Sequence, residues 1–230
     1  MKLIAYFRFL MLRTQLEASC ATRVGHMNDT TIRHYPNPST SDQADFLHRL
    51  YFGPGEDALL LAIRRAHQDL SRTVHGIGKN SEARPKATEL LRVEIAKLSG
   101  NPRIATQEAF DSWHRRICES LCGAYASADY ENFTIGQAQK WLNMTLKYVF
   151  VFGKARLPGY ETFYRFCHVP IDNIILESQT FSGLRTFTNR WSRLADYDEY
   201  LAFQRAVRER FPESCPLAVE FWAWQQTTGV

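Results

Sequence analysis

The chain has 230 residues, of which 45% are hydrophobic, 23% charged and 13% aromatic. This composition excludes a disordered chain, and the length allows one domain with a full core or two small lobes that share a cleft. The formal net charge is +4, and without residues 1–26, which hold four basic residues and one acidic residue, it is +1. Overall charge is therefore weak evidence for nucleic-acid binding, which has to rest on local features.

The cysteines show no paired spacing of the CxxC type, which argues against a disulfide framework and a four-thiolate metal or iron-sulfur site. A reducing cytoplasm is the compartment that fits this pattern. His114, Cys118 and Cys122 recur every four residues and share one helical face, but small cysteines beside apolar residues are more typical of packing than of a metal site. We therefore expect no metal. The five cysteines are Cys20, Cys118, Cys122, Cys167 and Cys215.

Residues 1–26 begin with a short apolar run that Arg8 interrupts and that is too short to span a bilayer. Two interpretations stay open: an amphipathic helix, or an extension upstream of a natural start at Met27. We favour the second, because the polar residues after Met27 are typical of an N-terminal lead-in. No membrane association is expected, and residues 27–230 are predicted to form a single helical domain and a monomer.

Helical periodicity recurs along the rest of the chain, whereas no succession of segments shows the period-2 alternation of a sheet. The predicted class is therefore mainly α. Thr106 and Asp172 stand where N-caps are expected, and Pro216 stands at a first helical position. The expected helices cover about 45–70 with a break at 53–55, 86–98, 107–121, 137–152, a start at 172, 198–211 and a start at 216.

The helix predicted over 137–152 carries Lys140 and Lys147, seven residues apart. Two helical turns separate them, so both project from nearly the same angle, about 10.5 Å apart along the axis, with Met144 between them. The rest of this helix is apolar nearly all round, which predicts burial, and buried lysines are costly without partners or a purpose. The alternative is that both extend to solvent along one polar stripe.

Two further segments carry candidate site residues. Asp172 follows Pro170 and stands at a helix start, where a simple capping role is also common. Near the C-terminus, Glu220 lies between apolar residues and close to Trp222 and Trp224. Two tryptophans beside an acid can line a pocket for a flat ring or seal the core; we expect one in the core and leave the other open.

Together these pieces resemble the helix-hairpin-helix DNA glycosylases, in particular the archaeal-type 8-oxoguanine DNA glycosylase branch. In that branch Gln-Lys is followed by a second lysine seven residues on, by a Pro-Val-Asp-like segment and by a C-terminal Pro-Leu-x-x-Asp. The similarity covers about residues 130–176 and 212–224, and nothing before residue 100 aligns. The matching residues are Gln139-Lys140, Lys147, Pro170-Ile171-Asp172 and Pro216-Leu217 with Glu220.

The resemblance implies two helical lobes with a cleft between them, and an enzyme that flips a modified base out of double-stranded DNA and excises it in base-excision repair. Lys140 would be the nucleophile that forms a Schiff base and allows strand cleavage by β-elimination, and Asp172 would stabilise the cationic sugar. The resemblance places Met144, Lys147, Glu220 and Trp222 or Trp224 around the flipped base.

In the superfamily, backbone N–H groups of a hairpin hold DNA phosphates, sometimes with a bound monovalent cation. The resemblance assigns this role to a turn near Thr134, Gly136 and Ala138, just before the lysine helix. Otherwise it implies no required cofactor. The cysteine-ligated iron-sulfur cluster of some superfamily members has no equivalent in this sequence.

The sequence departs from the branch at two positions that would touch the base. Met144 replaces an aromatic residue that stacks on the flipped base, and Glu220 replaces an aspartate. These differences leave open which base is excised, whether 8-oxoguanine or a hypermodified phage base, which would make the protein a defence enzyme. A helical DNA-binding protein without catalysis, in which Lys140 and Asp172 form only a structural pair, is a further alternative.

Overall fold

The computed structural model describes residues 37–78, 81–100 and 104–227. The predicted extension 1–26 and the possible start at Met27 lie outside them. The chain divides into two compact units, Met1–Pro54 and Gly55–Val230. Within the first unit, α2 (Thr40–Phe52) starts at a reciprocal capping box between Ser39 and Asp42 and stops at Gly53, whose φ of 86° favours glycine.

The second unit is mainly helical in its described part, and no β-strand occurs in residues 55–78, 81–100 and 104–227. The prediction of a mainly α protein is thus confirmed. Its elements are α3 (Ala58–Leu70), η1 (Ser71–Thr73), α4 (Ala83–Ala96), α5 (Gln107–Ala126), α6 (Ile135–Phe152), η2 (Glu161–Phe166), α7 (Asn173–Glu177), η3 (Gln179–Phe181), η4 (Trp191–Arg193), α8 (Tyr197–Arg210) and α9 (Pro216–Thr227), where η marks a 3₁₀ helix.

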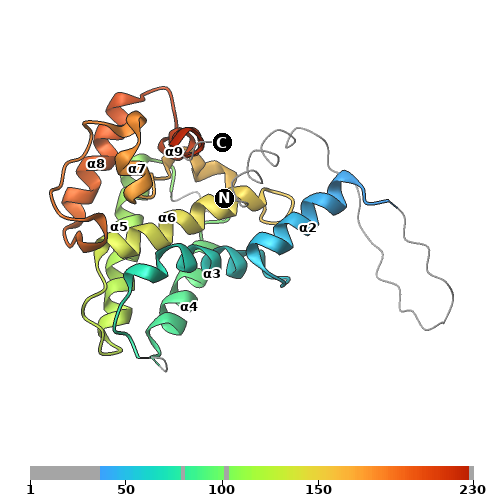
Figure 1. Cartoon of the computed structure of the whole chain (residues 1–230), viewed down its shortest axis with the longest axis horizontal. Coiled ribbons are helices and arrows are strands. Elements are labelled where there is room, and N and C mark those ends of the chain that lie inside the picture. The colour runs from blue at the N-terminus through green and yellow to red at the C-terminus, as the bar shows by residue number, and fades with distance from the viewer. Residues whose placement is uncertain (1–36, 79–80, 101–103, 228–230) are drawn as a thin grey trace. The chain divides into compact units, whose positions relative to one another are not determined.

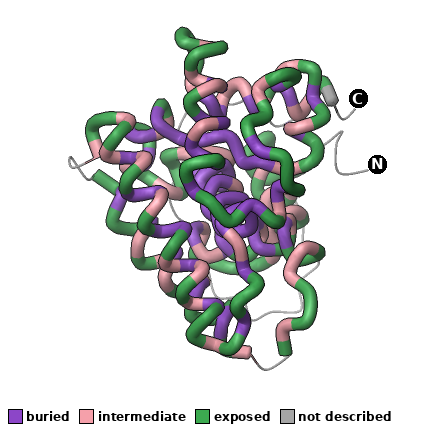
Figure 2. Tube along the Cα trace, turned by 90° about the vertical axis from the view of Figure 1, so that its left-hand side faces the viewer, coloured by how far each residue is buried: buried purple, intermediate pink, exposed green. Residues whose placement is uncertain are grey.

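Helix α6 is the core of this unit. Every residue of it except Met144, Phe150 and Val151 is buried. It packs along α3 and also contacts α5, α8 and η4 (Figure 1). Figure 2 shows the buried segments gathered in the interior with exposed turns around them. A helix that is apolar nearly all round has to be covered on all sides, which is the arrangement that the sequence predicted.

Helix starts follow the capping residues in the sequence. Thr106, Thr134 and Asp172 each accept a hydrogen bond from a backbone N–H in the first turn of α5, α6 and α7. At the other end of α6, Gly153 stops the helix with a φ of 70°. The caps predicted at Thr106 and Asp172 are confirmed, while α5 continues five residues beyond its predicted end near 121.

Candidate active site

Lys140 on α6 and Asp172 at the start of α7 form an ion pair. Asp172 uses both of its oxygens: Oδ2 accepts from Lys140 Nζ, and Oδ1 accepts from the backbone N–H of Ile175 at 2.9 Å. It is therefore a helix cap and a lysine partner at once. The Lys140 side chain is 7% exposed and that of Asp172 16%, so the pair lies just beneath the surface, and Asp172 is the more accessible partner.

Two glutamines hold the segment that leads to Asp172. Gln139, which is fully buried, donates to Ile171 O at 3.0 Å and accepts from Ile171 N at 3.1 Å. Gln204 on α8 forms the same double hydrogen bond with Val169, at 2.9 Å in both directions. This extended segment thus finds in two side-chain amides the partners that a β-strand would supply. These hydrogen bonds fix the segment before Asp172 and so place its carboxylate beside Lys140.

A network of buried polar side chains hydrogen-bonds to Gln139 and holds its amide in place. Asn143 donates to Gln139 Oε1 at 3.1 Å and to the Tyr200 hydroxyl at 2.9 Å, and it bonds His114 at 2.9 Å. Burial lowers the pKa of His114 well below its usual value and also lowers that of His168, which bonds Tyr200 at 2.8 Å. These histidines are therefore neutral hydrogen-bonding groups of the core at neutral pH.

Lys147 pairs with Glu220 on α9, and both side chains are buried. Nζ lies 2.7 Å from each carboxylate oxygen and donates to Oε1, whereas Oε2 accepts no hydrogen bond from a described residue. The ammonium also lies 4.7 Å from the Phe221 ring centroid and 5.5 Å from that of Trp224. Burial raises the pKa of Glu220, and the charge of Lys147 opposes that shift.

A third carboxylate, Asp69 on α3, accepts a hydrogen bond from the Tyr148 hydroxyl and lies 3.3 Å from Arg65. Burial raises its pKa, while the hydrogen bond from Tyr148, the charge of Arg65 and then the charges of Lys140 and Lys147 lower it. Asp69 is therefore within electrostatic reach of both lysines. The sequence did not single it out, because an aspartate in an amphipathic helix is ordinarily a solvated residue.

Trp191 of η4 lies against the catalytic candidate, with Lys140 Nζ 5.5 Å from its ring centroid. The loop carrying it is anchored to the start of α6: Gly136 N donates to Leu194 O at 2.9 Å, and Thr134 Oγ1 donates to Ser192 O at 3.0 Å. A Cβ atom at Gly136 would stand 1.7 Å from Trp191 O. Glycine is required there because the two backbones approach so closely.

No protein-family model, curated protein or solved structure matches this chain.

The backbone N–H groups of Thr134, Gly136 and Ala138, predicted as a phosphate-binding turn, all have partners within the protein. These residues form the cap and first turn of α6, and their polar groups already have partners. The Gly136 N–H bonds Leu194 O, the Ala138 N–H bonds Thr134 O, and the Thr134 N–H bonds Gln137 Oε1. The small residues suggested a turn in the sequence. In the structure, Gly136 instead allows the start of α6 to approach the backbone of η4 closely. The N–H groups of these three residues are therefore engaged within the protein, and a phosphate or a monovalent cation at this turn stays a prediction.

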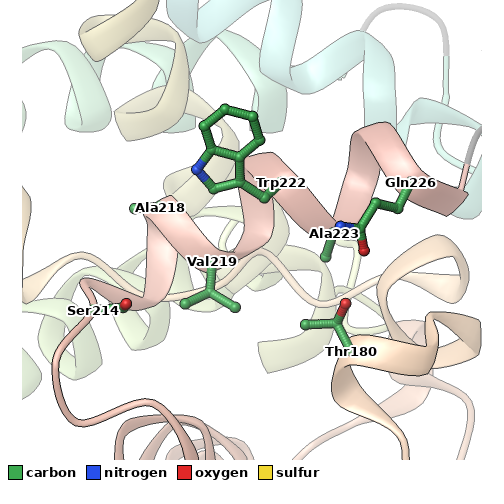
Figure 3. Close-up of a pocket in the computed structure, with 7 residues that line it drawn as sticks. All are labelled: Thr180, Ser214, Ala218, Val219, Trp222, Ala223 and Gln226. Atoms are coloured by element: carbon green, nitrogen blue, oxygen red, sulfur yellow. The ribbon is translucent and has the colours of Figure 1, made fainter.

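Of the other predicted pocket residues, Met144 is half-buried on α6 between the lysines, and Trp224 is half-buried beside Lys147. Trp222, at 67% exposed, lies elsewhere. It borders a cavity of about 230 Å³ that Thr180, Val219 and Gln226 also line. In Figure 3 its ring extends from one side of α9 while Val219 and Ala223 point toward Thr180. The described contacts thus place Trp224 beside Lys147, whereas a role for Trp222 at the base pocket stays a prediction.

The alternative that both lysines extend to solvent is also wrong, because Lys140 is 5% exposed and Lys147 6%.

A larger groove of about 810 Å³ lies elsewhere, between α3 and α4, and Arg64, His67 and Arg84 are among its lining residues. Within the described residues, no helix is long and apolar enough to cross a membrane, and no three His, Cys, Asp or Glu side chains gather as they would around a metal ion.

Proposed function

We propose that this protein is a DNA glycosylase with associated lyase activity, which flips a modified base from double-stranded DNA and excises it in base-excision repair. The observation that carries the proposal is the nearly buried Lys140–Asp172 pair, held by hydrogen bonds to the segment before Asp172. A lysine used only for solubility is exposed, whereas a lysine nucleophile needs a shielded site and a partner that sets its orientation.

In the proposed reaction, Lys140 Nζ attacks C1′ of the flipped nucleotide and the bond from C1′ to the base breaks with its electrons going to the base. Asp172 takes one proton from the Lys140 ammonium, so that Nζ attacks as the neutral amine, and passes that proton to the departing base. The Asp172 carboxylate stabilises the positive charge that develops on the sugar. The C1′–O4′ bond then breaks as O4′ takes a proton from Nζ, which leaves a protonated Schiff base between Lys140 and C1′. A base, for which Asp172 is the candidate, removes a proton from C2′, and the C3′–O bond breaks with its electrons going to the departing phosphate.

The second lysine supports a recognition role. Glu220 Oε2 lies 2.7 Å from the Lys147 ammonium and accepts no hydrogen bond from any other described residue, and this ammonium has further donors beyond the bond to Oε1. A donor and an acceptor side by side match the polar edge of a base, and Trp224 offers a ring next to them. We therefore assign base recognition to Lys147, Glu220 and Trp224, with Met144 between the two lysines.

A second candidate keeps the same chemistry but changes the target to a hypermodified base of phage DNA, which would make the protein a defence enzyme. The observation that favours it is Met144, half-buried at the face shared by the two lysines. An unbranched, flexible side chain adapts to a bulkier base more readily than a ring does. Under either target, the glycosylase proposal includes two helical lobes around a DNA cleft, a monomeric state and a cytoplasmic location.

The test is to trap the Schiff base with borohydride, which reduces it to a stable amine linking protein and DNA. A duplex with the correct modified base should give a covalent adduct on Lys140. Asp172→Asn keeps an acceptor for the Ile175 N–H but loses the charge. It should slow adduct formation by about 10²-fold or more while the protein stays folded. A binding protein without catalysis would bind DNA and give no adduct.

A further inference from the structure

The loop of residues 185–193 borders the proposed catalytic lysine. Its Trp191 ring lies 5.5 Å from Lys140 Nζ, and residues 192 and 194 are bonded to the first turn of α6 through Thr134 and Gly136. The loop therefore has a fixed position relative to Lys140. Whatever DNA strand presents a nucleotide to Lys140 has to pass close to this loop.

Trp191 is buried, whereas Arg190 and Arg193 on either side of it are exposed, and no ion pair of either with a described residue is present. The acidic residues that follow have other partners: Asp196 caps α8, and Asp198 pairs with Arg115. Arg190 is the N-cap of η4 and Arg193 its last residue. The backbone bond from Arg193 N to Arg190 O, at 2.8 Å, closes this turn and brings the two arginines close together along the chain.

The third arginine of the loop has a different role. Arg185 donates through Nε to Phe187 O at 2.7 Å and through Nη2 to Thr188 O at 3.1 Å, with a further bond to Asn189 O. Its guanidinium also lies 5.1 Å from the Phe187 ring centroid. Arg185, although exposed, therefore holds the backbone of the loop in shape, and the guanidinium groups of Arg190 and Arg193 project from a preorganised backbone, which reduces the entropy lost on binding.

We propose that this loop is the phosphate-binding element of the site, and that Arg190 and Arg193 contact the DNA backbone beside the flipped nucleotide. The inference rests on the proposed function. Guanidinium groups bind phosphate oxygens through two parallel hydrogen bonds, and such contacts position a duplex without reading its sequence. The loop occupies the backbone groups at the start of α6 that a phosphate would otherwise use, and it supplies two cations next to them.

The test measures how the affinity for DNA depends on salt. Each phosphate contact contributes about 0.9 to the slope of log K against log salt concentration on a duplex. The variant Arg190→Gln/Arg193→Gln should therefore lower the slope by about 2 and weaken binding at least ~10-fold at moderate salt. The probes are an unmodified duplex and one with a tetrahydrofuran abasic analogue. The matched control, Lys86→Gln/Arg210→Gln, removes two exposed charges from α4 and α8.

The outcomes separate the two proposals. If the wild type binds both duplexes, the loop variant loses slope and affinity, and the control variant keeps them, the inference holds. If the loop variant and the control variant lose equal slope and affinity, or neither variant changes, the loop does not bind phosphates. The glycosylase proposal is then still tested separately by borohydride trapping. If the full-length wild type binds neither duplex, both proposals are overturned. Circular dichroism of each variant checks that it is folded.

Discussion

The side-chain amide of Gln139 forms two hydrogen bonds with the backbone of Ile171, one in each direction, and so joins the lysine helix to the residue before Asp172. Gln139 is the neighbour of Lys140 in sequence, and Ile171 is the neighbour of Asp172. One amide therefore sets the distance between the two proposed catalytic groups. The same amide also donates to Gly136 O at 2.9 Å, which orients it.

Replacing Gln139 with Leu should reduce stability by about 2–3 kcal/mol, because the buried N–H and C=O of Ile171 lose their partners. Gln204→Leu is the matched control, since it removes the same double bond two residues earlier, at Val169. Both variants should lose similar stability in urea unfolding. Only Gln139→Leu should also slow adduct formation strongly. Equal slowing in both would mean that Gln139 has no special positioning role.

The close approach of Gly136 to Trp191 O predicts a large cost for one added methyl group. Gly136→Ala should destabilise the protein by at least ~2 kcal/mol, because a backbone carbonyl cannot move as a flexible side chain does. Gly123→Ala is the opposite case: Gly123 is exposed in α5 with nothing near its Cβ position. That change should stabilise by about 0.5–1 kcal/mol. Thermal unfolding of both variants measures the difference, and a neutral Gly136→Ala would contradict the packing described.

The Lys147–Glu220 pair predicts strong coupling. Lys147→Met leaves the Glu220 carboxyl buried without its cation, and Glu220→Gln leaves Lys147 without its anion; each should cost about 3–5 kcal/mol. The double variant should cost clearly less than the sum of the two. Chemical unfolding of the four proteins in the cycle gives the coupling energy, for which we expect at least ~2 kcal/mol. Additive effects would show that the two side chains do not interact in solution.

His67 predicts a pH dependence of stability. Burial lowers its pKa from 6.5 to about 4. Between these values the unfolded chain binds a proton that the folded protein does not, so stability falls as the pH falls from 6.5 toward 4. His67→Phe keeps a ring against Trp141 and removes this titration. The stability lost between pH 7.5 and 4.5 should be about 2 kcal/mol smaller in the variant than in the wild type. An unchanged difference would argue that His67 titrates normally.

Local signals predicted most of the fold. The break at Gly53–Gly55, the caps at Thr106 and Asp172 and the burial of the 137–152 helix each depend on a few neighbouring residues, and all are as predicted. The Lys140–Asp172 contact was expected only through a family resemblance. In the fold, Asp172 both caps α7 and pairs with Lys140 on α6.

What the sequence could not show depends on contacts between distant segments. Trp191 carries no periodic signal and follows a loop, so its place against Lys140 required the bond between Gly136 and Leu194. Trp222 and Trp224 are two residues apart, about 200° around a helix, so one of them had to face away from Lys147. The sequence left open which one. The answer came from the packing of α9.

The most direct test of the proposed function is borohydride trapping over a panel of duplexes that carry 8-oxoguanine, other oxidised bases or hypermodified phage bases. We predict a covalent adduct with at least one of them, mapped by mass spectrometry to Lys140, absent in Lys140→Gln and retained in Lys154→Gln, which removes an exposed lysine. No adduct with any modified base, or an adduct that persists in Lys140→Gln, would contradict the proposal.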